Sequence, residues 1–170
     1  MGKEVFHTIR HLKRTFTLEE WQDYCDSIRN DDDNRIVTRI GKYLWNHSDI
    51  CLNPETEEGV IKKADGWGNY SAEIAYANCG NGLWAFGYDI NTGTAGSSSG
   101  VSWADKSDLS KWNKGFESER ECKKYAWRYI LTRLQPNKDK NKMIARLYDE
   151  VEKKYKEYSR PQIVQLELFG

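Results

Sequence analysis

The sequence predicts an α+β fold with N-terminal helices, an antiparallel meander of three or more strands, two C-terminal helices and an extended C-terminal tail. Two changes of hydrophobic period support this fold class. Apolar residues recur at helical spacing up to residue 46 and again after residue 117, and they alternate in between. A length of 170 residues is typical of one domain. We therefore expect one α+β domain over residues 1–158 and a tail over residues 159–170.

Two helices are expected in the N-terminal part. The first begins at Thr17, which stands three residues before Glu20, the spacing of a capping box. The second is expected over residues 35–46, where apolar residues again recur at helical intervals. The acidic run at 30–34 is interpreted as a cap, because Asp side chains accept hydrogen bonds from free amides at a helix N-terminus.

The middle of the chain predicts a β-hairpin. Aromatic and aliphatic residues alternate with small or polar ones on both sides of a turn-forming sequence at 78–82. The alternating residues are Tyr70, Ala72, Ile74, Tyr76, Trp84, Phe86, Tyr88 and Ile90. We interpret them as the buried face of the sheet; the alternative is an exposed platform on which single-stranded bases stack. The opposite face is expected to be exposed to solvent and carries Ser71, Glu73, Ala75, Ala85, Gly87 and Asp89.

Two further strands are expected next to this hairpin. Residues 91–100 are rich in Gly, Ser and Thr and are interpreted as a flexible, turn-forming loop. Residues 101–105 are expected to return as a third strand. A strand is also expected before the hairpin, at about residues 59–62.

Two amphipathic helices are expected in the C-terminal part. Ser118 and Glu121 have capping-box spacing at the start of the first, which Pro136 ends. Its apolar stripe consists of Cys122, Tyr125, Ala126, Tyr129, Ile130 and Leu134. The second helix is expected over about residues 138–158, and Pro161 separates it from the tail.

Composition indicates a folded protein of the cytoplasm. The chain has no window of about 20 apolar residues, the length that spans a bilayer. Its first residues also lack the apolar core and cleavage site of a secretory signal, so we expect a cytoplasmic protein without membrane contact. Four widely spaced cysteines, Cys25, Cys51, Cys79 and Cys122, are expected to be reduced and buried.

Charge is distributed unevenly, although the net charge is zero. Residues 1–110 contain 11 Lys and Arg against 17 Asp and Glu, whereas residues 111–170 contain 15 against 9. The candidate nucleic-acid-binding residues are the basic side chains of the two C-terminal helices: Arg120, Lys123, Lys124, Arg128, Lys138, Lys140 and Lys142. Two alternatives stay open: these residues form solvated helix faces, or the basic half packs against the acidic half.

No motif predicts catalysis, a metal site or a cofactor. His7 and His11 stand four residues apart but lack the Glu of a zinc-protease helix and any cysteine pair. The small residues at 93–100 lack the Lys and Thr of a phosphate-binding loop. A catalytic site assembled from distant residues stays an open alternative.

The tail contains Gln165, Leu166, Glu167, Leu168 and Phe169. This pentapeptide resembles the linear motif with which bacterial replication and repair proteins dock on the β sliding clamp. The motif runs Gln-Leu-(Ser or Asp)-Leu-Phe, and Glu167 is the one departure from it. The resemblance implies that Gln165 donates or accepts a hydrogen bond at one end of a groove, while Leu168 and Phe169 enter an apolar pocket. The alternative is that residues 163–169 form a strand packed on this protein.

The sequence as a whole therefore predicts a non-enzymatic bacterial, phage or mobile-element accessory protein. We expect its body to bind DNA, RNA or a replication partner, and its tail to dock on the sliding clamp. The alternatives are a nucleic-acid-processing enzyme and a protein-binding inhibitor.

Overall fold

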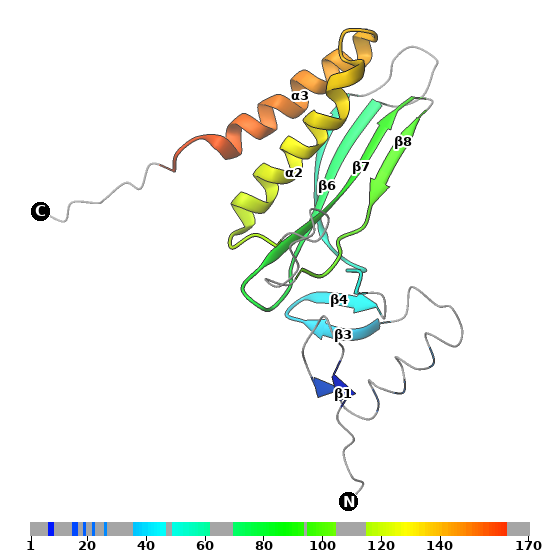
Figure 1. Cartoon of the computed structure of the whole chain (residues 1–170), viewed down its shortest axis with the longest axis vertical. Helices are drawn as coiled ribbons and strands as arrows, with labels where there is room; N and C mark the ends of the chain where they lie inside the picture. The colour runs from blue at the N-terminus through cyan, green and yellow to red at the C-terminus, as the bar shows by residue number, and fades with distance from the viewer. Residues whose placement is uncertain are drawn as a thin grey trace, which may run out of the picture.

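The computed structural model describes residues 36–46, 49–61, 70–93, 95–104 and 115–162, and before them His7, Thr8, Thr15, Phe16, Glu19, Gln22 and Asp26. Its largest sheet is antiparallel with strand order β5-β6-β7-β8. These strands are Glu55–Ile61, Tyr70–Asn78, Trp84–Thr92 and Gly96–Ser99. Helices α2 (Glu119–Leu134) and α3 (Lys142–Ser159) cover one face of this sheet (Figure 1). The α+β class, with an antiparallel sheet followed by two helices, is confirmed.

The predicted hairpin is strands β6 and β7, which pair in register from Tyr70 opposite Thr92 to Asn78 opposite Trp84. Two asparagine side chains fold the turn: Asn78 Oδ1 accepts from Gly80 N at 2.8 Å, and Asn81 Oδ1 accepts from Leu83 N at 3.1 Å. Gly80 has a φ of 76°, a backbone conformation that glycine adopts at little cost.

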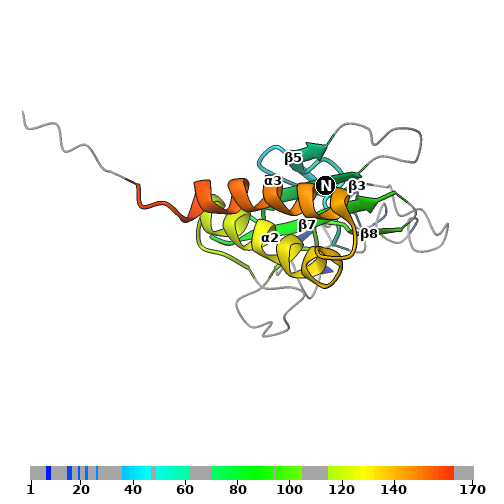
Figure 2. The ribbon, with the colours of Figure 1, turned by 90° about the horizontal axis from the view of Figure 1, so that it is seen from above.

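The aromatic and aliphatic face of the hairpin is core, as predicted. Ala72, Ile74, Tyr76, Tyr88 and Ile90 are buried against the two helices, and the remaining alternating residues are half-buried. Helix α2 packs on β6 and β7, and α3 packs on β5 and β6. Viewed from above, the two helices lie side by side over the strands (Figure 2). The edge strand β8 therefore lies beyond α2.

The predicted cap of α2 is confirmed, because Ser118 Oγ accepts from Glu121 N at 3.1 Å. The predicted apolar stripe was too narrow: Trp127 and Leu131 are also buried. The last helix begins at Lys142 and not at Lys138, because residues 135–140 form a 3-10 helix (Gln135–Asn137) and a turn. Asn141 caps α3 by accepting from the amides of Met143 and Ile144.

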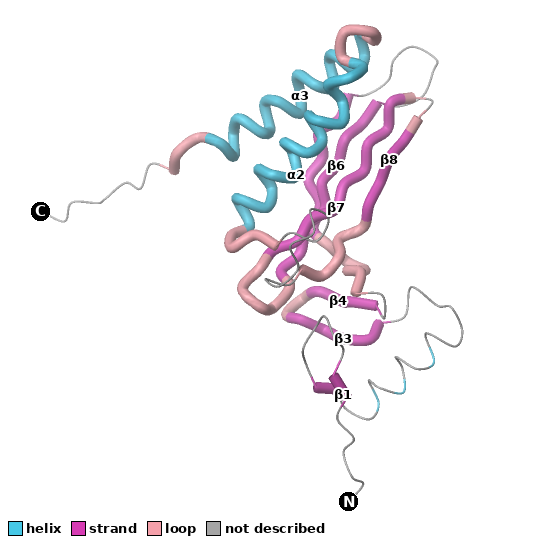
Figure 3. The backbone as a smooth tube through the Cα atoms, in the orientation of Figure 1, coloured by secondary structure: helices cyan, strands magenta, loops and turns pink. Residues whose placement is uncertain are grey.

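The predicted helix over residues 35–46 is wrong. Residues 36–46 form a hairpin in which β3 (Ile36–Ile40) pairs with β4 (Tyr43–Asn46), below the large sheet in Figure 3. The sequence of β3, IVTRI, is rich in β-branched residues, which favour strands, and Gly41 takes a φ of 58° in the turn. The alternation in β4 buries Tyr43 and Trp45.

The structure describes little of the chain before this hairpin. Strands β1 (His7–Thr8) and β2 (Thr15–Phe16) pair antiparallel. Of the predicted helix after Thr17, the described residues Glu19, Gln22 and Asp26 are helical. The other residues of this helix and the acidic run at 30–34 lie outside the described part of the chain.

The prediction of a strand at 101–105 is also wrong. The fourth strand is β8, which lies inside the predicted loop, and a tight turn joins it to β7 through the bond from Thr92 N to Ala95 O at 2.8 Å. Strand β5, predicted at about 59–62, begins earlier, at Glu55.

The segment after β8 crosses the second face of the sheet, so this face is not fully exposed as predicted. Val101 and Trp103 are buried with Ala85, Trp45 and Cys79 in a second apolar cluster. Glu73 and Ala75 are half-buried, and Asp89 is exposed. Ala85 and Gly87 are thus buried where exposure was predicted, and residues 99–103 together with β4 cover them.

The three described cysteines, Cys51, Cys79 and Cys122, are buried with free thiols, as expected. Burial raises the pKa of the Cys79 thiol to about 11. Cys25 lies outside the described residues. Among the described helices, none combines the length and the apolar composition needed to cross a membrane.

Candidate nucleic-acid interface

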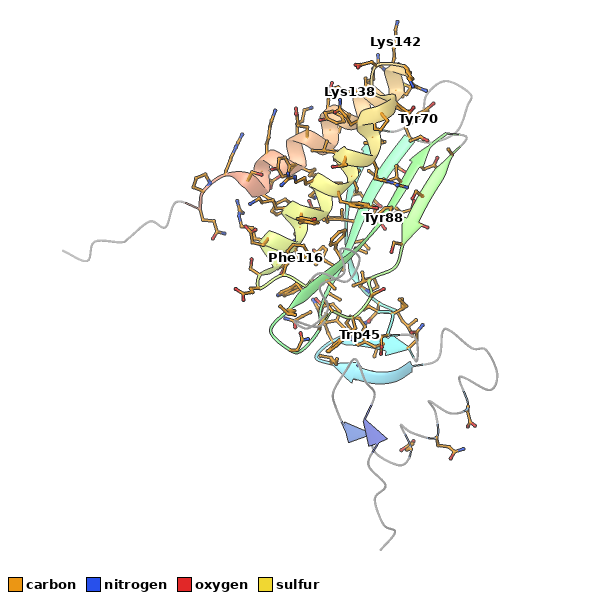
Figure 4. All side chains as sticks on the ribbon, viewed as in Figure 1. Trp45, Tyr70, Tyr88, Phe116, Lys138 and Lys142 are labelled. Atoms are coloured by element: carbon orange, nitrogen blue, oxygen red, sulfur yellow. The ribbon has the colours of Figure 1, made fainter. Side chains whose placement is uncertain are left out.

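The seven basic residues predicted to bind nucleic acid lie in different settings. Arg120, Lys123 and Lys124 lie in the first half of α2, and Arg128 lies further along the same helix. Lys138, Lys140 and Lys142 lie at the α2–α3 turn. Lys138 and Lys142 are labelled in Figure 4, at the opposite end of the helical layer from the start of α2.

Arg120 holds the end of α3. Its guanidinium donates to the carbonyl oxygens of Glu157 at 3.0 Å and Arg160 at 2.7 Å. Glu157 lies in the last turn of α3, where carbonyls lack a helical partner and the helix dipole favours a cation, and Arg160 is the C-cap residue of this helix. Arg120 thus ties the first turn of α2 to the C-terminal end of α3.

Lys123 lies inside a charged network and its side chain is 13% exposed. Its ammonium lies 2.7 Å from Glu119, 3.8 Å from Glu57 and 4.4 Å from the centre of the Tyr76 ring. Burial alone would lower the pKa of Lys123, but the hydrogen bonds with Glu119 and Tyr76 outweigh it and raise this pKa. A charge held in this way is poorly placed to reach a phosphate.

Glu57 is the centre of that network and was not singled out from the sequence. Its carboxylate accepts from Trp127 Nε1 at 3.2 Å and from the Tyr158 hydroxyl, and it lies 3.4 Å from Lys154 Nζ. The residue therefore joins strand β5 to both helices. Nothing in the sequence ETEEGVI distinguishes Glu57 from the acidic residues beside it, so no signal could have found it.

Three of the seven predicted residues are exposed, and they lie in the second half of α2 and at the α2–α3 turn. Arg128, Lys140 and Lys142 are exposed. Lys138 is half-buried, with its ammonium 3.9 Å from the centre of the Tyr148 ring. Lys124 lies apart from them and pairs with Glu121 at 3.4 Å. Three of the seven predicted residues thus gather at one end of the molecule, with Arg128 on the adjoining helix.

Arg133 is a further exposed cation that the sequence reasoning missed. It lies on α2, where its guanidinium donates to Ser97 Oγ of β8 at 3.1 Å. Its position four residues after Tyr129 places both on one side of the helix, and this spacing could have drawn attention to it.

A cavity of about 450 Å³ opens between the end of α2 and strand β8. Apolar side chains form its inner wall, and polar groups from both elements stand around it. Its lining includes Ile90, Ser97, Thr132, Arg133, Leu134 and Asn137. Because Asn137 is followed directly by Lys138, the cavity and the basic turn are continuous along the chain.

Two tyrosines adjoin this cavity through Ser97. The Tyr88 hydroxyl lies 3.2 Å from Ser97 Oγ, and the rings of Tyr88 and Tyr129 have centres 4.9 Å apart. The hydrogen bond with Ser97 lowers the pKa of Tyr88 below its ordinary value, and the positive charge of Arg133 acts in the same direction. The region thus combines aromatic rings, a guanidinium and hydroxyl groups.

The predicted clamp-binding residues Gln165, Leu166, Leu168 and Phe169 lie outside the described residues, which end at Gln162. Comparisons of this chain with protein-family models, with curated proteins and with solved structures found no match.

Proposed function

We propose that this chain is an accessory protein of bacterial, phage or mobile-element DNA replication or repair. It docks on the bacterial β sliding clamp through Gln165–Phe169 and contacts nucleic acid through the α2–α3 turn. The observation that carries the proposal is the sequence QLELF, which keeps four of the five residues of the clamp-binding motif.

The chemistry of this pentapeptide supports docking on another protein. A short segment gains useful affinity when a few large side chains enter a pocket, and Leu168 and Phe169 are side chains of this kind. Gln165 adds an amide that can both donate and accept hydrogen bonds at the edge of the groove.

The position of the preceding helix also supports it. Helix α3 ends at Ser159, where Arg120 holds its last turn, and Pro161 and Gln162 are exposed. The basic α2–α3 turn is at the other end of α3, which rises about 27 Å over its length. The last described residues before the pentapeptide and the basic turn therefore lie at opposite ends of one helix, which supports separate surfaces for the two contacts.

The clamp contact is tested with the full chain and purified β clamps from several bacterial phyla. We expect the double substitution Leu168→Ala/Phe169→Ala to weaken binding at least about 30-fold in calorimetric titration, because each anchor side chain contributes about 2 kcal/mol. The matched control is Ile163→Ala/Val164→Ala, which removes two apolar side chains outside the pentapeptide and is expected to leave affinity within about 2-fold. Absence of binding to every clamp, or equal losses in both variants, would contradict the proposal.

The nucleic-acid contact is tested by the salt dependence of binding. In fluorescence anisotropy with single- and double-stranded DNA, Lys140→Gln/Lys142→Gln should lower the slope of log affinity against log salt by about 1 to 2, because two phosphate contacts are lost. The control Lys153→Gln/Lys156→Gln removes the same charge from exposed positions of α3 and should leave the slope unchanged. No binding at low salt, or equal slopes for the two variants, would refute contact through the turn.

A further inference from the structure

We propose that the cavity between α2 and β8 receives one unpaired nucleotide of a single-stranded nucleic acid, with Arg133 as the principal contact. This inference rests on the proposed function, since it names the form of nucleic acid that the basic region takes. Four features of the described residues carry it: the size of the cavity, the placement of Arg133, the aromatic side of α2 and the basic turn beside it.

The size and lining of the cavity fit a nucleotide. Its volume of about 450 Å³ lies within the range of roughly 300–1,000 Å³ that small-molecule sites occupy. Ile90 and Leu134 provide an apolar wall, which suits the faces and edges of a base. Thr132 and Asn137 provide hydroxyl and amide groups, which suit its polar edge.

Arg133 is placed at this cavity by a contact across two elements. Its bond to Ser97 Oγ uses one of the five N–H donors of a guanidinium, and this planar group binds phosphate in bidentate fashion or stacks on a base. Ser97 is also within hydrogen-bond distance of the Tyr88 hydroxyl. The hydroxyl of Ser97 therefore ties the guanidinium to the sheet and limits the freedom it would lose on binding.

Aromatic rings continue from Arg133 along the same side of α2. Tyr125, Tyr129 and Arg133 stand four residues apart, so they form one stripe on the helix. The rings of Tyr125 and Tyr129 lie 6.0 and 6.1 Å from that of Phe86, and all three residues are half-buried. Proteins hold single strands by stacking successive bases on aromatic side chains beside positively charged groups, and arginine adds cation–π contacts.

The basic turn supplies charge for the sugar-phosphate chain on the other side of the cavity. Lys138 follows the lining residue Asn137, and Lys140 and Lys142 are exposed beside it. A concave site of this size admits a base only when that base is not paired in a duplex. The geometry therefore favours single strands over duplexes.

The experiment measures the preference between strands. Anisotropy is recorded for the full chain with a single-stranded 12-mer and with a hairpin duplex of the same composition. We expect Arg133→Ala to weaken the single strand about 10-fold and the duplex no more than about 2-fold, since a stacked or hydrogen-bonded base is worth about 1–3 kcal/mol. Ala95→Leu, which fills the cavity from an exposed position without changing charge, should give the same selective loss.

Three controls make the outcome decisive. Lys153→Gln removes a charge from a side chain that is 71% exposed and does not line the cavity, so it should change neither affinity. Thermal unfolding of each variant shows whether the fold is retained. Competition with a free mononucleotide shows whether the cavity binds a nucleotide within a strand or a free nucleotide. If the mononucleotide competes as well as the 12-mer, mole for mole, the proposal that the ligand is a single strand is overturned.

These measurements distinguish a failure of the cavity site from a failure of the proposed function. Equal affinity for duplex and single strand, or an Ala95→Leu variant that binds like the parent protein, overturns the cavity site. The proposed contact through the turn would still stand if Lys140→Gln/Lys142→Gln lowered the salt slope. Absence of any binding at low salt overturns both.

Discussion

Replacing Trp127 with alanine is expected to lower the free energy of unfolding by about 4 kcal/mol, the largest loss we predict for one side chain. Trp127 is fully buried between the sheet and α3, and its indole ring packs against Gly59 of β5. The substitution removes this ring and also the N–H group that donates to Glu57 at 3.2 Å. Glu57 would then lose one of its hydrogen-bond partners, which adds to the cost of removing the ring.

Urea denaturation followed by circular dichroism measures this loss, which corresponds to a lower melting temperature by roughly 10 °C for a chain of this length. Trp127→Phe separates the two contributions, because it keeps an aromatic ring and removes the N–H donor; we expect a loss of about 2 kcal/mol. Arg128→Ala, at the exposed neighbouring position, should change stability by no more than about 0.5 kcal/mol. A Trp127→Ala variant within about 1 kcal/mol of the parent would contradict the packing described.

Trp127 also shows the limit of what the sequence of α2 predicts about its packing. The cap at Ser118 and the six predicted stripe residues followed from local spacing, and local spacing is enough to place one face of a helix. Trp127 and Leu131 lie beside that stripe and are buried as well. Helix α2 contacts both the sheet and α3, so two faces are covered, and the second face depends on a helix that the spacing within α2 cannot reveal.

The β3–β4 hairpin illustrates a conflict between two periods. Ile36, Ile40 and Tyr43 suit a helical stripe, yet Tyr43 and Trp45 also alternate as in a strand. The β-branched residues of β3 and the turn residue Gly41 favour the hairpin, and both are present in the sequence. A helical period over so short a segment is therefore weaker evidence than β-branched residues followed by a turn glycine.

The candidate site could be predicted only in part. Lys138, Lys140 and Lys142 were recognised because basic residues close in sequence stay close in the structure. Arg133 and Ser97 are 36 residues apart and meet because β8 lies beside α2, which no motif indicates. Lys123 was grouped with the basic residues, although Glu57, 66 positions earlier, binds it into the fold. Charge alone does not distinguish a lysine that holds two elements together from one that reaches a partner.

Substitution of Gly87 by alanine is expected to lower the free energy of unfolding by about 3 kcal/mol. A Cβ atom at Gly87 would lie 2.4 Å from the carbonyl oxygen of Ser99 and 2.7 Å from the carbonyl carbon of Gly100. Both contacts are with backbone, so no side chain can rotate away to relieve them. The segment that follows β8 would have to move away from β7. It would carry with it Val101, which is buried and whose carbonyl accepts a hydrogen bond from Cys51 N.

Gly96→Ala is the matched control, because Gly96 lies on the adjacent strand β8 and its added Cβ would meet Ile90 O at an ordinary 3.4 Å. That variant should be as stable as the parent or more stable by up to about 1 kcal/mol, since alanine loses less backbone freedom than glycine on folding. Chemical denaturation of the two variants compares the same added methyl group in two settings of one sheet. Equal stability of Gly87→Ala and Gly96→Ala would mean that residues 99–101 do not contact β7 at Gly87. A loss confined to Gly87→Ala would show that glycine at this position allows the segment to lie against the sheet and bury Val101 and Trp103.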